Sequence, residues 1–173
     1  MNFVKVLTGV SKEDIKIENR KRVFRIPDDF GEIRNAAFAG MRNVPVDVVI
    51  VPRNIRFIEN AAFSGLNTQV LIFEGRVVAG ERYKMVENVT TLDIEDDAAN
   101  PFDGCVAKYV VAQSPEDVRA LKKAAHSFVD GRGNLISDVE IENFATRSQF
   151  EEHIKRESQA KKGDNQGQRW RIV

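Results

Sequence analysis

Short runs of β-branched and aromatic residues recur along the chain and predict strands. Two of these runs, at 23–26 and 48–51, lead directly into Pro27 and Pro52. Proline fixes φ and has no N–H for a strand ladder, so we expect the chain to leave the sheet at both positions. Similar runs follow at 70–73, 92–94 and 109–112. The pattern therefore predicts successive strands at repeat-like spacing.

The segments that contain the two prolines repeat each other. Residues 26–41 align with residues 51–66 without a gap, at an offset of 25 residues. The identical pairs are Pro27/Pro52, Ile33/Ile58, Asn35/Asn60, Ala36/Ala61, Ala37/Ala62, Phe38/Phe63 and Gly40/Gly65. A fixed offset in this range is typical of a solenoid, in which each turn adds a strand and equivalent side chains stack. We therefore expect Phe38 and Phe63 to fill adjacent places in its interior.

A third, shortened repeat is predicted just after residue 100. The residues from Asn100 to Cys105 read Asn-Pro-Phe-Asp-Gly-Cys, with the same order of phenylalanine, glycine and apolar residue. Residues 74–89 do not keep the pattern. Two interpretations stay open for them, a repeat that has lost its signature or an inserted hairpin.

The repeated signature, Ile-Pro-x-x-Phe/Ile-x-x-Ile-x-Asn-Ala-Ala-Phe-x-Gly, resembles the BspA-type leucine-rich repeat. The resemblance is specific at 26–41 and 51–66, partial at 92–112, and extends at most over 23–128. It implies a non-catalytic repeat solenoid of the kind found on bacterial and protist surfaces, where such proteins act in adhesion and protein binding.

Two helices are predicted after the last strand-like run. Ser114 is a suitable N-cap, followed by Pro115 and two acidic residues, and an apolar stripe recurs at 118, 121, 125 and 128. This helix is expected to close one end of the solenoid, because repeat stacks need caps. Ser148 and Glu151 form a capping-box pattern that predicts a second helix through about Ala160.

These elements predict an α/β fold: a leucine-rich-repeat-like solenoid with a parallel sheet, a helical C-terminal cap and a small α+β addition. The expected units are N-terminal cap strands at 1–22, the solenoid with its capping helix at 23–128, a strand–turn–strand at 129–145, and a helix with a tail at 146–173.

Composition supports a globular chain and leaves the charge pattern open to two interpretations. The chain has 173 residues, of which 42% are hydrophobic and 30% charged, and this is too apolar for a disordered protein. Acidic and basic residues number 26 each, yet 91–146 is acidic and both ends are basic. The asymmetry fits either anionic partners at the ends or attraction between the ends and the middle.

The N-terminal residues lack the long apolar region and cleavage site of an export signal, and no apolar run is long enough to span a membrane. We expect a soluble, cytoplasmic protein. The single cysteine, Cys105, excludes an intramolecular disulfide. It occupies the repeat position of Met41 and Leu66, which predicts a buried apolar role.

Catalytic and cofactor motifs are not found in the sequence. Neither histidine has the neighbours of a metal site, and no glycine-rich phosphate loop is present. We expect no cofactor, no metal and no enzymatic activity. An enzyme would need Glu95, Asp97 and His126 to converge in one pocket, and their spacing does not indicate that.

Two surfaces are candidates for binding. The first is the outward sheet face of the solenoid, with Arg25, Ile50, Asp93 and Glu95 as its expected contact residues. The second consists of the basic stretches at 20–22 and 169–171. There, Trp170 is expected either to anchor the C-terminus or to stack on a base.

The sequence thus supports two hypotheses. The first is a non-enzymatic protein–protein interaction module that uses the sheet face, with possible homo-oligomers. The alternative is a nucleic-acid-associated accessory protein that binds through its basic termini.

Overall fold

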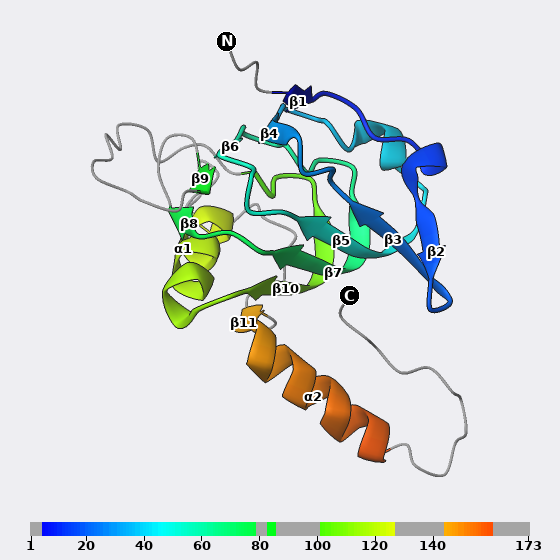
Figure 1. Ribbon diagram of the computed structural model, residues 1–173, viewed down its shortest axis with the longest axis vertical. Helices are drawn as coiled ribbons and strands as arrows, with labels where there is room; N and C mark the ends of the chain where they lie inside the picture. The colour runs from blue at the N-terminus through cyan, green and yellow to red at the C-terminus, as the bar shows by residue number, and fades with distance from the viewer. Residues whose placement is uncertain (1–4, 79–82, 86–100, 127–143, 161–173) are drawn as a thin grey trace, which may run out of the picture.

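The computed structural model describes residues 5–78, 83–85, 101–126 and 144–160. These residues form an α/β fold with two mixed sheets and two helices (Figure 1). Sheet A has the strand order β1 (Lys5–Leu7), β4 (Phe30–Ile33), β6 (Phe57–Ile58), β9 (Tyr83–Met85), β8 (Val77–Val78). Sheet B has the order β11 (Phe144–Thr146), β10 (Val106–Ala112), β7 (Asn67–Phe73), β5 (Val46–Val51), β3 (Lys21–Arg25), β2 (Lys16–Glu18).

The helices are α1 (Pro115–His126) and α2 (Arg147–Ala160), and two 3₁₀ turns lie at Lys12–Asp14 and Ala39–Met41. Within the described ranges, neither helix is long and apolar enough to cross a membrane.

Four of the five predicted strand runs are confirmed as neighbouring parallel strands of sheet B, namely β3, β5, β7 and β10. The fifth run, 92–94, lies outside the described residues. Val23 is opposite Val48 between β3 and β5, the same 25-residue offset that aligns the two sequence segments. Each aligned segment also supplies a second strand that the sequence did not indicate. These strands, β4 and β6, pair in parallel in sheet A, with Glu32 opposite Phe57.

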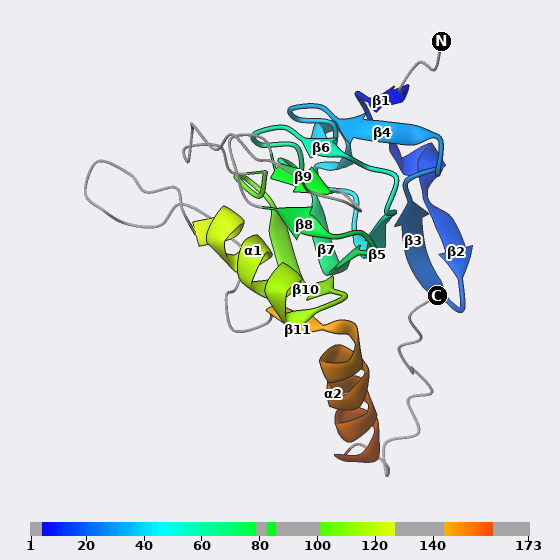
Figure 2. The same cartoon turned by 60° about the vertical axis from the view of Figure 1, so that its left-hand side comes forward.

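The main core lies between the two sheets, which Figure 2 shows on opposite sides of the molecule. The predicted neighbourhood of Phe38 and Phe63 is confirmed, with ring centroids 5.5 Å apart. Phe102 continues the column, 5.7 Å from Phe63. All three rings are fully buried, and each such burial contributes about 1.5–3 kcal/mol.

The chain makes the same turn after each ring of this column. The N–H groups of Met41, Leu66 and Cys105 donate to the carbonyls of Phe38, Phe63 and Phe102, at 2.9, 3.0 and 2.9 Å. The predicted burial of Cys105 is therefore confirmed, since its side chain fills the place that Met41 and Leu66 fill elsewhere.

Neighbouring turns are also joined directly. The Asn35 side chain donates to the carbonyl of Asn60 at 2.7 Å, and the Ala36 N–H donates to the carbonyl of Ala61 at 2.9 Å. Ala36 and Ala61 both have the left-handed backbone conformation, with φ of 57° and 55°. Equivalent residues therefore adopt the same unusual geometry and bond to each other across 25 residues.

Helix α1 begins where the sequence predicts, after Ser114. The Asp117 N–H donates to Ser114 Oγ at 3.2 Å, and the Ser114 hydroxyl donates to the Asp117 carboxylate at 2.9 Å. The other oxygen of this buried carboxylate accepts the Val77 N–H at 3.1 Å. Val118 and Leu121 bury the apolar side of α1 against the main core.

Helix α2 begins earlier than the capping box at Ser148 indicated, and its described residues extend to Ala160. Its cap is Thr146, whose hydroxyl accepts the Gln149 N–H at 3.3 Å. The Gln149 side chain in turn accepts the Thr146 N–H at 3.0 Å. The Thr146–Gln149 pair and the Ser148–Glu151 pair both match the capping-box sequence pattern. Thr146 provides the cap because it ends β11, which pairs with β10.

Of the two interpretations of 74–89, the described residues 74–78 and 83–85 favour the hairpin. Val77 of β8 is opposite Met85 of β9, and these strands run antiparallel. Strand β9 also runs antiparallel to β6, whereas the repeats pair in parallel. The predicted strand–turn–strand lies outside the described residues except for its end in β11, and so does the tail at 161–173.

The turn that carries Gly65 provides a test of the close approach between neighbouring turns. Gly65 has φ of +93°, and a Cβ there would lie 2.9 Å from the carbonyl oxygen of Phe38. We expect Gly65→Ala to lower the free energy of unfolding by about 1–3 kcal/mol, measured by urea unfolding.

Gly9→Ala is the matched control, because a Cβ at Gly9 would meet nothing within 4 Å. Its effect should stay within about 0.5 kcal/mol. Equal losses in the two variants would contradict the close packing of the turns.

Candidate interaction surface

The described residues include two of the five predicted contact residues, Arg25 and Ile50. They lie opposite each other on β3 and β5. Asp93, Glu95 and Trp170 lie outside the described part of the chain.

The prediction that Ile50 is available to a partner is wrong. Ile50 points to the outer face of sheet B, as the strand alternation indicates, but only 2% of it is exposed. It belongs to a second apolar cluster with Val23, Val48, Val70, Ile72, Val111 and Phe150. Arg25 also reaches across β5 to an ion pair with Glu74, which follows β7. Ile50 therefore packs within this apolar cluster and is not accessible to a partner.

Helix α2 attaches to the β10 side of this outer face. Phe150 is buried, with its ring 5.1 Å from that of Tyr109, and Ile154 packs beside them. The Tyr109 hydroxyl lies 3.0 Å from His153 Nε2, and the same nitrogen is 3.1 Å from Glu157 Oε1. The first turns of α2 thus cover the β10 side of this face, and the helix then extends away from the sheets (Figure 2).

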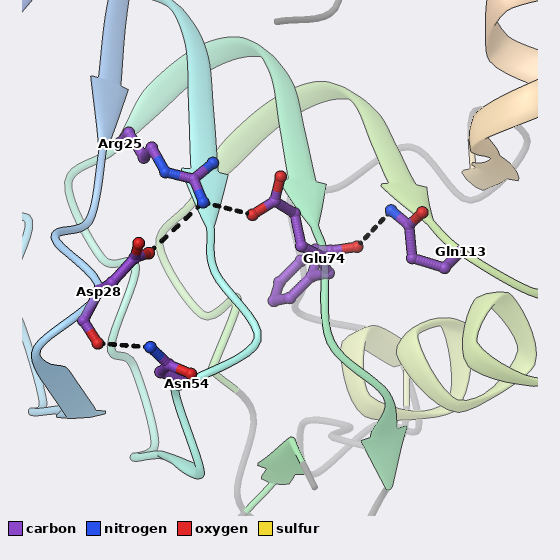
Figure 3. Close-up of polar contacts among 6 residues, drawn as sticks. Arg25, Asp28, Asn54, Glu74 and Gln113 are labelled. Carbon is purple, nitrogen blue, oxygen red and sulfur yellow. Dashed lines mark hydrogen bonds and ion pairs between the residues drawn. The ribbon is translucent and has the colours of Figure 1, made fainter. Parts of the chain in front are cut away.

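Polar side chains gather instead where the parallel strands end, as Figure 3 shows. We call this set the carboxyl rim; it consists of Arg25, Asp28, Asn54, Glu74 and Gln113. One Arg25 nitrogen lies 2.8 Å from Glu74 Oε1 and 3.4 Å from Asp28 Oδ1. Asn54 donates to the backbone carbonyl of Asp28 at 2.6 Å. Gln113 donates to the carbonyl that ends β7, at 2.9 Å.

The carboxyl rim has one cation and two carboxylates. The hydrogen bond to Glu74 raises the pKa of Arg25, against the opposing effect of partial burial. Arg25 thus stays charged and fixed between its two partners. The Asp28 side chain is 69% exposed, whereas that of Glu74 is 22% exposed. The rim therefore presents Asp28 outward on a scaffold held by hydrogen bonds.

A signal for the rim was present in the sequence. Glu74 and Gln113 directly follow two of the predicted strand runs, and Asp28 follows the proline that ends a third. Residues just after parallel strands meet at one edge of the sheet. Alternation along a strand indicates the face to which a side chain points and gives no indication of this edge.

The residues that an enzymatic site would need lie mostly outside the described part of the chain. Glu95 and Asp97 are not described, and neither is the side chain of His126, so their convergence is untested. Where the structure describes the chain, no three His, Cys, Asp or Glu side chains group as metal ligands.

The basic stretch at 20–22 is tied to an acidic residue. Arg22 lies near Asp47, which accepts its backbone N–H at 2.7 Å and is 3.5 Å from its Nε. Burial lowers the pKa of Lys21, and the nearby charge of Asp47 only partly opposes this. Both features weaken this stretch as a phosphate-binding site.

We find no match to this chain among protein-family models, characterised proteins or solved structures. The resemblance to BspA-type repeats thus depends on the chain's own residues.

The link across the carboxyl rim can be measured by a double-mutant cycle. Arg25→Gln and Glu74→Gln each remove one charge from a partly buried ion pair. We expect a coupling of about 0.5–1 kcal/mol between them in urea unfolding.

Arg156 and Glu152 on α2 form the control pair, since their side chains are 75% and 64% exposed. Their coupling should be about 0.3 kcal/mol. A rim coupling no larger than this control would mean that the Arg25–Glu74 contact does not fix the rim.

Proposed function

We propose that the chain is a short leucine-rich-repeat-like solenoid of the BspA type and acts as a non-enzymatic protein-binding module. The observation that carries this proposal is the set of contacts that join residues 25 positions apart. Val23 pairs with Val48, Asn35 bonds to Asn60, and Arg34 forms an ion pair with Glu59 at 2.9 Å. These contacts involve a strand, a turn and a surface charge, so the offset relates whole units of structure rather than one element.

Further contacts support the solenoid part of the proposal. Phe102 extends the ring column, and the Gly65 N–H donates to the carbonyl of Gly104 at 3.0 Å. Helix α1 packs Val118 and Leu121 onto the core beside β10, as a cap does. The hairpin β8–β9 is then an insertion between the second and third turns.

The partner is proposed to bind at the carboxyl rim rather than at the centre of the sheet face. Ile50 and its neighbours are buried, whereas Asp28 is exposed and its surroundings are held by hydrogen bonds. A preorganised polar surface loses little conformational entropy when it binds. The excess of carboxylates over cations favours a protein partner that offers Lys, Arg or hydrogen-bond donors.

Capture from a lysate of the native source tests this function. The whole chain is immobilised, and capture is compared for the wild type, Asp28→Asn and Glu13→Gln, with and without nuclease, at two salt concentrations. Glu13 is exposed in the 3₁₀ turn Lys12–Asp14, so both variants lose one exposed carboxylate. We expect a defined protein that survives nuclease, and about tenfold weaker capture by Asp28→Asn alone.

Two results would count against the proposal. Loss of all capture after nuclease, with steep salt dependence, would favour the nucleic-acid alternative. Equal capture by Asp28→Asn and wild type would exclude the carboxyl rim as the binding surface. Circular dichroism of each variant controls for folding.

A further inference from the structure

The strand β2 forms an edge of sheet B. Its one partner among the described strands is β3, to which it pairs antiparallel. Its central residue, Ile17, is 70% exposed, more than any other large apolar side chain that the structure describes. An apolar side chain on an open edge strand is a feature that proteins usually avoid, because such an edge can pair with another chain.

The backbone of Ile17 faces this open edge. Ile17 is opposite Arg22, and the Arg22 N–H donates to Asp47 on β5 rather than back toward β2. Opposed residues in an antiparallel pair either exchange both hydrogen bonds or direct both away from each other. Ile17 and Arg22 are thus a pair that exchanges no hydrogen bonds, and the N–H and C=O of Ile17 point away from β3.

The turn that joins β2 and β3 supports this register. Asn19 and Arg20 both have positive φ, 51° and 66°, as in the two-residue turns of β-hairpins. In such a hairpin the residues that flank the turn, Glu18 and Lys21, exchange hydrogen bonds. The next pair, Ile17 and Arg22, does not.

The sequence of β2 is complementary to itself when two copies run antiparallel. If Ile17 is placed opposite Ile17 of a second copy, each Lys16 comes to lie opposite Glu18 of the other copy. Opposite charges at directly opposed positions stabilise a strand pair, and the two isoleucines cover each other on the other face. The central pair would exchange two backbone hydrogen bonds, since both residues turn their N–H and C=O outward.

We propose that β2 is a self-association edge, through which a second copy of this chain continues sheet B across a two-fold axis at Ile17. The interface is isologous, because the same three residues supply both sides. Lys16 on this edge disfavours pairing with other strands, whereas in the proposed dimer it lies opposite Glu18 of the second copy. This surface is separate from the carboxyl rim, so the inference does not depend on the proposed function.

Substitutions that exchange the charges of Lys16 and Glu18 in the whole chain test the proposed register of the two β2 strands. Sedimentation equilibrium across a concentration series should show the wild-type mass rising above the monomer value of 19.5 kDa. Lys16→Glu alone and Glu18→Lys alone each place like charges opposite each other, and should weaken association roughly tenfold. The double variant, K16E with E18K, restores both opposite-charge pairs and should associate like the wild type.

An equimolar mixture of the two single variants gives the most specific result. One chain then has two acids and the other two bases, so the mixture should form mixed dimers although neither variant associates well alone. Ile17→Pro provides an independent test of the backbone, because it removes the outward N–H without removing a bond to β3. It should abolish association while far-UV circular dichroism stays the same.

Three results would overturn the proposal. A wild-type chain that stays monomeric up to millimolar concentration has no self-association edge. Single charge variants that associate as strongly as the wild type would place the interface elsewhere. A mixture of the single variants that stays monomeric would exclude the antiparallel register about Ile17.

Discussion

The column of phenylalanine rings between the two sheets is the constraint on which the rest of the structure depends. Phe38, Phe63 and Phe102 are fully buried and in contact, so the turns that carry them must lie at matching heights. This fixes the strand register on both sides, because a slip by one residue would exchange the core and outer faces of a strand. The Asn35–Asn60 bond and the Arg34–Glu59 ion pair join residues at the same 25-residue offset as the rings Phe38 and Phe63.

The parts of the fold that could be predicted from sequence are those with a local physical cause. Prolines end strands, and Ser114 offers its oxygen to a helix start, so both were located correctly. The parallel strands of sheet A were missed, since Phe57–Ile58 is too short to show alternation. At the start of α2, Thr146 and Ser148 fit the same capping rule, and the choice depends on the pairing of β11 with β10.

The candidate site was less predictable, for a reason that Ile50 illustrates. Alternation along β5 gives the side of the sheet to which Ile50 points, but not what lies over that side. Glu74, which forms an ion pair with Arg25 across β5, follows a later strand, and Phe150 lies in a helix near the end of the described chain. The carboxyl rim likewise joins side chains at the ends of β3, β5, β7 and β10, and only their common position at strand ends could be inferred from sequence.

The buried carboxylate of Asp117 has a consequence for motion. One of its oxygens accepts the Ser114 hydroxyl at the start of α1, while the other holds the backbone of β8. Release of the β8–β9 hairpin would leave Asp117 Oδ1 without the Val77 N–H, and fraying of α1 would remove this acceptor from Val77. We therefore expect the two segments to open as one cooperative unit, whose amides exchange with solvent together.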